Sequence, residues 1–357
     1  MRYVVYAIPL PYSIEKYRIG QLYMVARATV EATTSRSADG FEVLKNEPYK
    51  RTLPSGKEEE GIYTFKIMHL SRMVPKAIAA FIPKKGLKME ETCYNAFPHT
   101  ITTYHNPGYP DKLAMSVETW VYPAEKNARY SKTAFALPEE VRASIPASFT
   151  LEKKGKEEKK ADLKAAKEQQ ATDGMNRLDF VEAKGGVIER IYCDVSTPLA
   201  IDKKKEARDK RNAKKDGREF TPTDPESQKA DIKRISAESG GDHCVVYKIL
   251  KIHTAFPGEK LIEGFLARKM ERVFTETHKK SCLWWDEWKN MTPEDIKKVE
   301  EEAAATLKTY LENRPAGGES TTESAVEDED LIVEEGASEK GDNDNDNGAG
   351  GVEGPAE

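Results

Sequence analysis

The chain has 357 residues, of which 38% are hydrophobic and 33% are charged, so it has enough apolar side chains for a folded core. Residues 315–357 carry 14 acidic side chains and one lysine, which leaves 55 basic against 47 acidic side chains in residues 1–314. No apolar run reaches the roughly 18 residues that span a bilayer, and four scattered cysteines exclude a disulfide framework.

The first expected elements are a strand, "RYVVYAIPLP", and a helix over residues 13–32. Runs of β-branched and aromatic residues with alternating polarity then predict further strands. These are "GFEVLKN", "GIYTFKIMHL", "HTITTYHN", "KLAMSVETWVYP", "GGVIERIYCDV" and "HCVVYKILKIH". Many strands followed by long helices indicate an α+β fold rather than a doubly wound α/β fold.

Two long helices are expected at the end of the folded part, one over residues 258–290 and one that begins at Thr292. Thr292 is a typical N-cap, because Pro293 follows at the first helical position and Asp295 at the third. We expect one domain over residues 1–314, with charged surface insertions at about 141–174 and 201–218. Residues 315–357 are predicted to form a disordered acidic tail.

Several polar residues fall on otherwise apolar faces of these elements. Lys66 lies within "GIYTFKIMHL", Lys248 alternates onto an apolar row, and Thr119 shares a face with leucine, methionine and valine. Glu300 flanks the apolar stripe of the last helix, and Gln21 lies between apolar positions of the first. For any one of these residues there is an ordinary explanation. A lysine side chain can reach solvent along an apolar surface, or the residue can have been assigned to the wrong face of its element. Together they indicate paired charges or a polar ligand in the interior.

No catalytic or metal-binding motif competes with this interpretation. The chain has no GxSxG, HExxH, P-loop or GxGxxG motif, and its six histidines lack metal-ligand spacing. We therefore expect neither an enzyme nor a resident cofactor. A nucleic-acid role would rest only on the mixed-charge run "IDKKKEARDKRNAKKDGR", which has no interleaved aromatic residues.

Seven segments resemble the phosphatidylinositol transfer proteins, in the order that the family has along the chain. They are "YSIEKYRIGQLYMVA", "VLKNEPY", "GIYTFKIMHLSRMVP", "CYNAFPHT", "VETW", "VYKILKI" and "TPEDIKKVEEE". The resemblance covers roughly residues 1–122 and 187–311 and leaves the acidic tail unmatched. It implies a START-like, helix-grip fold, in which a concave, mostly antiparallel sheet and long helices enclose a lipid cavity.

The resemblance also implies a function. We expect a monomeric cytoplasmic carrier that binds one phosphatidylinositol, contacts membranes transiently, and exchanges its cargo for phosphatidylcholine or phosphatidic acid. By motif, the residues that hold the inositol ring are Thr64, Lys66, Asn95 and Glu300. Contacts with the phosphate or with the second lipid are expected from Gln21, Thr100, Thr102, Thr119 and Lys248.

Departures from the family pattern leave two points open. Phe256 and Pro257 stand where many members have a membrane-inserting tryptophan pair, so they are the expected docking residues. The tryptophans of "LWWDEW" are interpreted instead as packing residues. Thr100 and Met270 replace a cysteine and a glutamate found in several members, which leaves the second lipid undecided. An alternative function is a lipid-sensing signalling adaptor that recruits partners through the insertion and the acidic tail.

Overall fold

The computed structural model describes residues 2–34, 40–53, 56–70, 87–124, 138–143, 175–183 and 186–313. Its strands are β1 (Arg2–Leu10), β2 (Phe41–Thr52), β3 (Glu58–His69), β4 (Lys88–Ala96), β5 (His99–His105), β6 (Leu113–Ala124), β7 (Met175–Ala183), β8 (Gly186–Cys193) and β9 (His243–Thr254). Its α-helices are α1 (Ile14–Thr34), α3 (Glu139–Ala143), α5 (Lys203–Lys215), α6 (Ile232–Glu238), α7 (Glu259–Leu283), α8 (Trp285–Trp288) and α9 (Pro293–Glu312).

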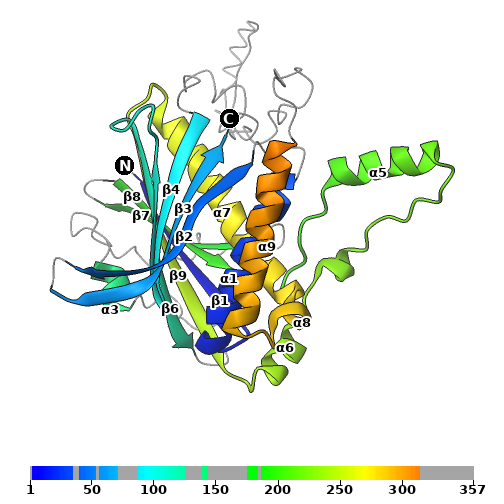
Figure 1. Ribbon diagram of the computed structural model, residues 1–357, viewed down its shortest axis with the longest axis horizontal. Coiled ribbons are helices and arrows are strands. Elements are labelled where there is room, and N and C mark those ends of the chain that lie inside the picture. The colour runs from blue at the N-terminus through cyan, green and yellow to red at the C-terminus, as the bar shows by residue number, and fades with distance from the viewer. Residues whose placement is uncertain are drawn as a thin grey trace, which may run out of the picture.

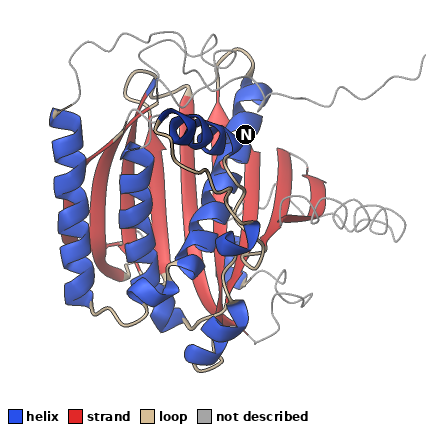
Figure 2. Cartoon of the chain, turned by 90° about the vertical axis from the view of Figure 1, so that its right-hand side faces the viewer, coloured by secondary structure: helices blue, strands red, loops and turns tan. Residues whose placement is uncertain are grey.

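The strands form one curved sheet in the order β2-β3-β4-β5-β6-β9-β1-β8-β7 (Figure 1). Neighbouring strands are antiparallel except β1 and β8, which are parallel. The long helices α1, α7 and α9 lie across one face of this sheet (Figure 2). This arrangement confirms the expected α+β class and is consistent with a START-like fold.

The main core lies between β1, β9 and the helices. Alternate residues of β1, among them Val4, Tyr6 and Ile8, have no exposed surface and face the helical layer. On the opposite face of the sheet, Val141 of α3 packs against Tyr3 and other residues of β1 and β9. Because side chains alternate along a strand, the central strands are buried on both faces.

The alternation predicted for β6 and β9 is confirmed by burial. The apolar neighbours of Lys248 on its face of β9 (Cys244, Val246, Leu250 and Ile252) have no exposed surface. Thr119 is 5% exposed, between the buried Val117 and Val121. Both polar residues therefore belong to the inner face of the sheet.

Strands β4 and β7 and helices α3 and α6 were not expected from the sequence. The helix predicted over residues 258–290 is divided at Trp284, where the backbone has φ −86° and ψ 10°. The division lets Trp285 stack on Tyr12, with ring centroids 5.5 Å apart, and brings Trp288 into the core. The tryptophans are packing residues as expected, with Trp285 1% and Trp288 0% exposed.

The start of α9 is as predicted. The N–H of Asp295 donates to Oγ1 of Thr292 at 3.2 Å, and the N–H of Thr292 donates to Oδ2 of Asp295 at 3.0 Å. These reciprocal bonds satisfy backbone donors that the first helical turn leaves unpaired.

The second charged insertion contains α5, which projects from the rest of the fold with exposed side chains at Lys210, Arg211 and Lys214 (Figure 1). Of the first insertion, only residues up to Ala143 are described. The predicted acidic tail, residues 315–357, lies outside the described residues.

Two helical glycines give a matched test of this packing. A Cβ at Gly20 of α1 would lie 2.7 Å from the Trp288 ring, whereas one at Gly264 of α7 would lie 3.5 Å from its nearest neighbours. We expect Gly20→Ala to destabilise the protein by about 1–2 kcal/mol, because overpacking outweighs the gain in helix propensity. Gly264→Ala should be neutral or stabilising. Urea denaturation of both variants measures this, and equal stabilities would contradict the packing of Trp288 on α1.

Candidate functional site

A large cavity lies between the inner face of the sheet and the helices α1, α7 and α9. Its volume is about 1670 Å³, above the roughly 300–1,000 Å³ of ordinary small-molecule pockets. The helices supply most of its apolar wall: Leu22, Met24 and Val25 of α1, Phe265, Met270 and Phe274 of α7, and Ala304 and Leu307 of α9. The strands supply most of its polar floor.

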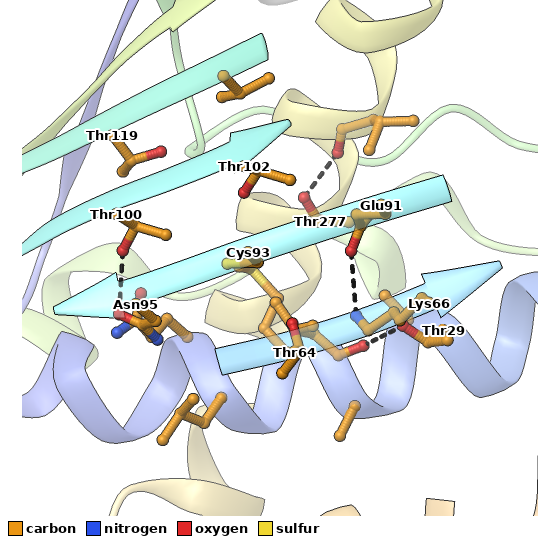
Figure 3. Close-up of a pocket in the computed structure, with 18 of the residues that line it drawn as sticks. Thr29, Thr64, Lys66, Glu91, Cys93, Asn95, Thr100, Thr102, Thr119 and Thr277 are labelled. Carbon is orange, nitrogen blue, oxygen red and sulfur yellow. Dashed lines mark hydrogen bonds and ion pairs between the residues drawn. The ribbon is translucent and has the colours of Figure 1, made fainter. Parts of the chain in front are cut away.

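All nine residues that the resemblance assigned to a lipid headgroup line this one cavity. They come from seven elements: Gln21 of α1, Thr64 and Lys66 of β3, Asn95 of β4, Thr100 and Thr102 of β5, Thr119 of β6, Lys248 of β9 and Glu300 of α9. Figure 3 shows the threonines, Lys66 and Asn95 around the same space. Residues as much as 279 positions apart, from Gln21 to Glu300, are thus brought to one site.

Lys66 marks one end of the floor. Its Nζ lies 3.4 Å from Oε1 of Glu91 on β4, and the two side chains are 12% and 14% exposed (Figure 3). Glu300, the carboxyl group assigned to the inositol ring, also interacts with Lys66 through its charge. Burial raises the pKa of Glu300, while a hydrogen bond with Asn46 and the charge of Lys66 oppose that shift. Glu300 therefore faces the same end of the cavity from α9.

Asn95 and Thr100 are cross-strand partners, and Thr100 is in turn the cross-strand partner of Thr119. The Thr100 hydroxyl donates to Oδ1 of Asn95 at 2.9 Å (Figure 3). This bond orients the Asn95 amide, whose NH₂ group keeps its two donors for other partners.

Lys248 marks the other end. Its Nζ donates to Oγ1 of Thr119 at 3.2 Å and lies 5.1 Å from the centroid of the Phe274 ring. Burial lowers the pKa of Lys248 from 10.5 to about 8. The side chain of Lys248 is therefore still protonated at neutral pH, but few protein groups offset the cost of burying its charge.

His278 of α7 lies near this lysine. Burial and the charge of Lys248 lower the pKa of His278 to about 3, so the ring is neutral. Its Nδ1 donates to the carbonyl of Phe274 at 2.7 Å, and its Nε2 accepts from the Tyr17 hydroxyl at 3.2 Å. Both ring nitrogens are used structurally, which leaves Lys248 as the cationic group at this end.

Cys93 lies between the two lysines. Its pKa is raised by burial, and Lys66 and hydroxyl groups of Thr102 and Thr64 act in the opposite direction. The charge of the same cysteine acts to raise the pKa of Lys248, against the larger effect of burial. The floor therefore carries one ammonium group at each end and hydroxyl groups between them.

Sequence reasoning missed Glu91, Cys93 and His278. The first two belong to β4, which was not predicted, and His278 lies inside an apolar helix where a core role is the ordinary interpretation. A signal for Glu91 exists: it is two and four residues before Cys93 and Asn95, which places all three on one strand face.

The two expected membrane-docking residues lie outside the cavity. Phe256 is 5% exposed, and its ring meets that of Tyr109 edge-on with centroids 5.3 Å apart. Pro257 is exposed. Docking through Phe256 would require its side chain to leave this packing, so the assignment stays a prediction.

Among the described residues, no group of histidine, cysteine, aspartate and glutamate side chains has the arrangement of a metal site. In the same part of the chain, no helix combines the length and apolar character needed to cross a bilayer. The cavity between the sheet and the helices has apolar walls and a polar floor.

Comparisons with known proteins agree with this geometry. The family model described as phosphatidylinositol transfer protein matches residues 1–175 and 148–305. Phosphatidylinositol transfer protein 1 of Dictyostelium discoideum is 27% identical over 315 residues, which are 87% of this chain and 95% of that protein. The phosphatidylinositol transfer protein beta isoform of Mus musculus is 28% identical over 323 residues, or 89% of this chain and 97% of that protein. Protein retinal degeneration B of Drosophila melanogaster is 29% identical over 90% of this chain, but the match covers 22% of that longer protein.

Proposed function

The chain belongs to the phosphatidylinositol transfer protein family, and from this premise we propose that it carries one phosphatidylinositol in the cavity between the sheet and the helices. The observation that carries the proposal is the convergence of all nine expected headgroup residues on that cavity. The family consists of lipid transfer proteins, and we propose a carrier role for this chain without catalysis.

The polarity of the floor supports a defined orientation of the headgroup. The inositol ring would lie toward Lys66, where Thr64 and Glu300 offer donors and acceptors, with Asn95 further along β4. Ring hydroxyls suit such a set because each can donate and accept. The phosphate would lie toward Lys248, with Thr119 and Thr102 nearby.

The apolar wall gives the thermodynamic reason for a closed cavity. The two acyl chains of a phospholipid contain about 30 methylenes, each worth about 0.8 kcal/mol on removal from water. Passage through water is therefore very slow without a carrier. The side chains of α1, α7 and α9 that face the cavity would replace the bilayer around these chains.

We extend the proposal to exchange against a second phospholipid, phosphatidylcholine or phosphatidic acid. Either lipid shares the phosphate and so would use Lys248, but neither has a ring to engage Lys66. Transient membrane contact, for a carrier that works from the cytoplasm, is proposed at Phe256 and Pro257. These residues precede α7, one of the helices that line the cavity.

Mass spectrometry of lipid that co-purifies with the protein from a eukaryotic host tests the proposal. We expect phosphatidylinositol at close to one molecule per chain, together with a minor lipid that identifies the exchange partner. Phosphatidic acid or phosphatidylcholine alone would retain a lipid carrier and reject the inositol assignment. A lipid-free protein that also fails to load from vesicles would reject the carrier function.

A further inference from the structure

Helix α5 contains most of the excess positive charge of residues 1–314. It has eight Lys and Arg residues and two acidic residues, whereas the rest of residues 1–314 has 47 basic against 45 acidic side chains. The excess of acidic side chains lies in residues 315–357. The chain thus separates its charge into one basic helix and one acidic segment, and the remainder is nearly balanced.

Helical spacing places the basic residues of α5 on one face. Lys203, Lys210 and Lys214 form a row along the helix, and Arg211 and Lys215 form the next row. All five side chains are exposed. None of the five forms an ion pair with another residue that the structure describes. We call these five residues the basic face of α5.

Another side of α5 holds the segment that follows the helix. Ala213 is 2% exposed, and its carbonyl accepts from the N–H of Arg218 at 2.8 Å. Oε1 of Glu206 accepts from the N–H of Thr223 at 2.9 Å. These contacts use the side of the helix that contains Ala213 and Glu206, so they leave the basic face uncovered.

The charges of α5 work against the helix that contains them. Lys210 repels Lys214 and Arg211 repels Lys215, because like charges at i and i+4 are neighbours on a helix. Residues 203–205 are all lysines, and they begin the helix at the end where its macrodipole disfavours cations. An anionic partner along the basic face would offset both effects.

The acidic segment of the same chain is within reach of this face. Helix α9 ends at Glu312, and Figure 1 shows α5 on the helical side of the sheet, level with that end. The densest acidic run, "EDEDLIVEE" at residues 327–335, has six acidic side chains in nine residues and starts 15 positions after Glu312. Fifteen residues span at most about 50 Å. A partner on the same chain also has a high effective concentration.

We propose that the basic face of α5 is a docking site for the acidic run 327–335 of the same chain. Charge complementarity selects this partner, and because the groups are exposed, salt weakens the attraction. The family model matches residues up to 305, so the acidic run lies beyond the matched part of the chain. The inference does not depend on the proposed carrier function. In the docked state, an anionic bilayer has to displace the acidic run before it can reach α5.

Carbodiimide cross-linking of the full chain tests the contact, because it joins a carboxylate to an amine only where the two meet. We expect links from Lys210, Lys214 or Lys215 to the run 327–335 at about 0.1 M salt. At about 1 M salt the screening length falls from about 10 Å to about 3 Å, and about tenfold fewer links should form. Mixing isotope-labelled with unlabelled protein distinguishes links within one chain. Links to other lysines only, links between chains only, or a yield independent of salt would overturn the proposal.

Two variants of equal net charge separate docking from a general effect of charge. The first combines Glu327→Gln, Asp328→Asn, Glu329→Gln and Asp330→Asn, and the second combines Asp342→Asn, Asp344→Asn, Asp346→Asn and Glu353→Gln. Neither variant changes residues 1–314. The first should raise hydrogen exchange of the α5 amides about three- to tenfold, because the helix loses its partner, and the second should leave the wild-type rates. Equal exchange in the two variants would contradict docking of the run 327–335.

Binding of the same variants to phosphatidylcholine vesicles that contain phosphatidylserine tests an anionic bilayer as the alternative occupant. If the acidic run covers α5, the first variant should bind these vesicles at least about threefold more tightly than the second. Equal binding by the wild type and both variants would show that the acidic run does not cover the basic face, and would overturn the proposal.

Discussion

Lys66→Ala is expected to lower phosphatidylinositol transfer about 10- to 100-fold while transfer of the second phospholipid changes by no more than about twofold. The ammonium group would form charge-assisted hydrogen bonds with the inositol ring, and such bonds contribute about 1.5–3 kcal/mol. A lipid without the ring makes no use of them. Transfer of two differently labelled lipids between vesicles, measured on one preparation, gives both rates together.

The exposed Lys50 on β2 is the matched control, and Lys50→Ala should retain both activities. Lys66→Ala also leaves Glu91 without its cation, so the free energy of unfolding must be measured alongside transfer. Equal loss of both lipids would show general damage to the fold. Unchanged phosphatidylinositol transfer would reject the assignment of Lys66 to the inositol ring.

Alternation along a strand explains why much of the site could be predicted. Side chains two positions apart share a face, so their apolar neighbours in the sequence are enough to predict that Thr119 and Lys248 lie on the inner face. The structure agrees, because the same neighbours are buried and both polar residues line the cavity. Glu300 is predicted in the same way, from its place beside the stripe of Ile296 and Leu307, each 2% exposed.

The same rule failed for β4 for a physical reason. The inner face of this strand lines a ligand cavity instead of a packed core, so Met89, Glu91, Cys93 and Asn95 have no common polarity. The strand therefore has no periodic apolar signal that would predict it. The contact of Lys66 with Glu91 could not be predicted either, because it depends on the register between β3 and β4.

Tertiary packing explains a second difference between prediction and structure, the division of the helix at Trp284. Residues 258–290 have the composition of one helix, but a continuous helix would not place both Trp285 and Trp288 against Tyr12. The break at Trp284 serves contacts with Tyr12 and with α1, which lie more than 260 positions away in the chain. A local pattern cannot encode such a partner.

Lys248→Met is expected to reduce transfer of phosphatidylinositol and of the second phospholipid together, by about 10- to 100-fold or more. Both lipids carry the phosphate that Lys248 would pair with, and an ionic hydrogen bond in a dry cavity contributes at least as much as the one at Lys66. The two-label vesicle assay measures both rates. Lys251→Met, on the outer face of the same strand, is the control and should retain transfer.

The same substitution should stabilise the protein when it has been stripped of lipid. The pKa of Lys248 is about 8 in the folded chain and 10.5 for an ordinary lysine, so between these values the unfolded chain binds more protons. The wild type therefore bears a penalty of about 3 kcal/mol at neutral pH, which is relieved as pH rises from 8 to 10.5. Lys248→Met removes the penalty, and the stability difference between variant and wild type should shrink as pH rises through this range.

A residue with a purely structural role would behave in the opposite way, since its loss would destabilise the lipid-free protein. Denaturation at pH 7.5 and 9.5 distinguishes the two, and a less stable, pH-independent variant would contradict a ligand-binding role for Lys248.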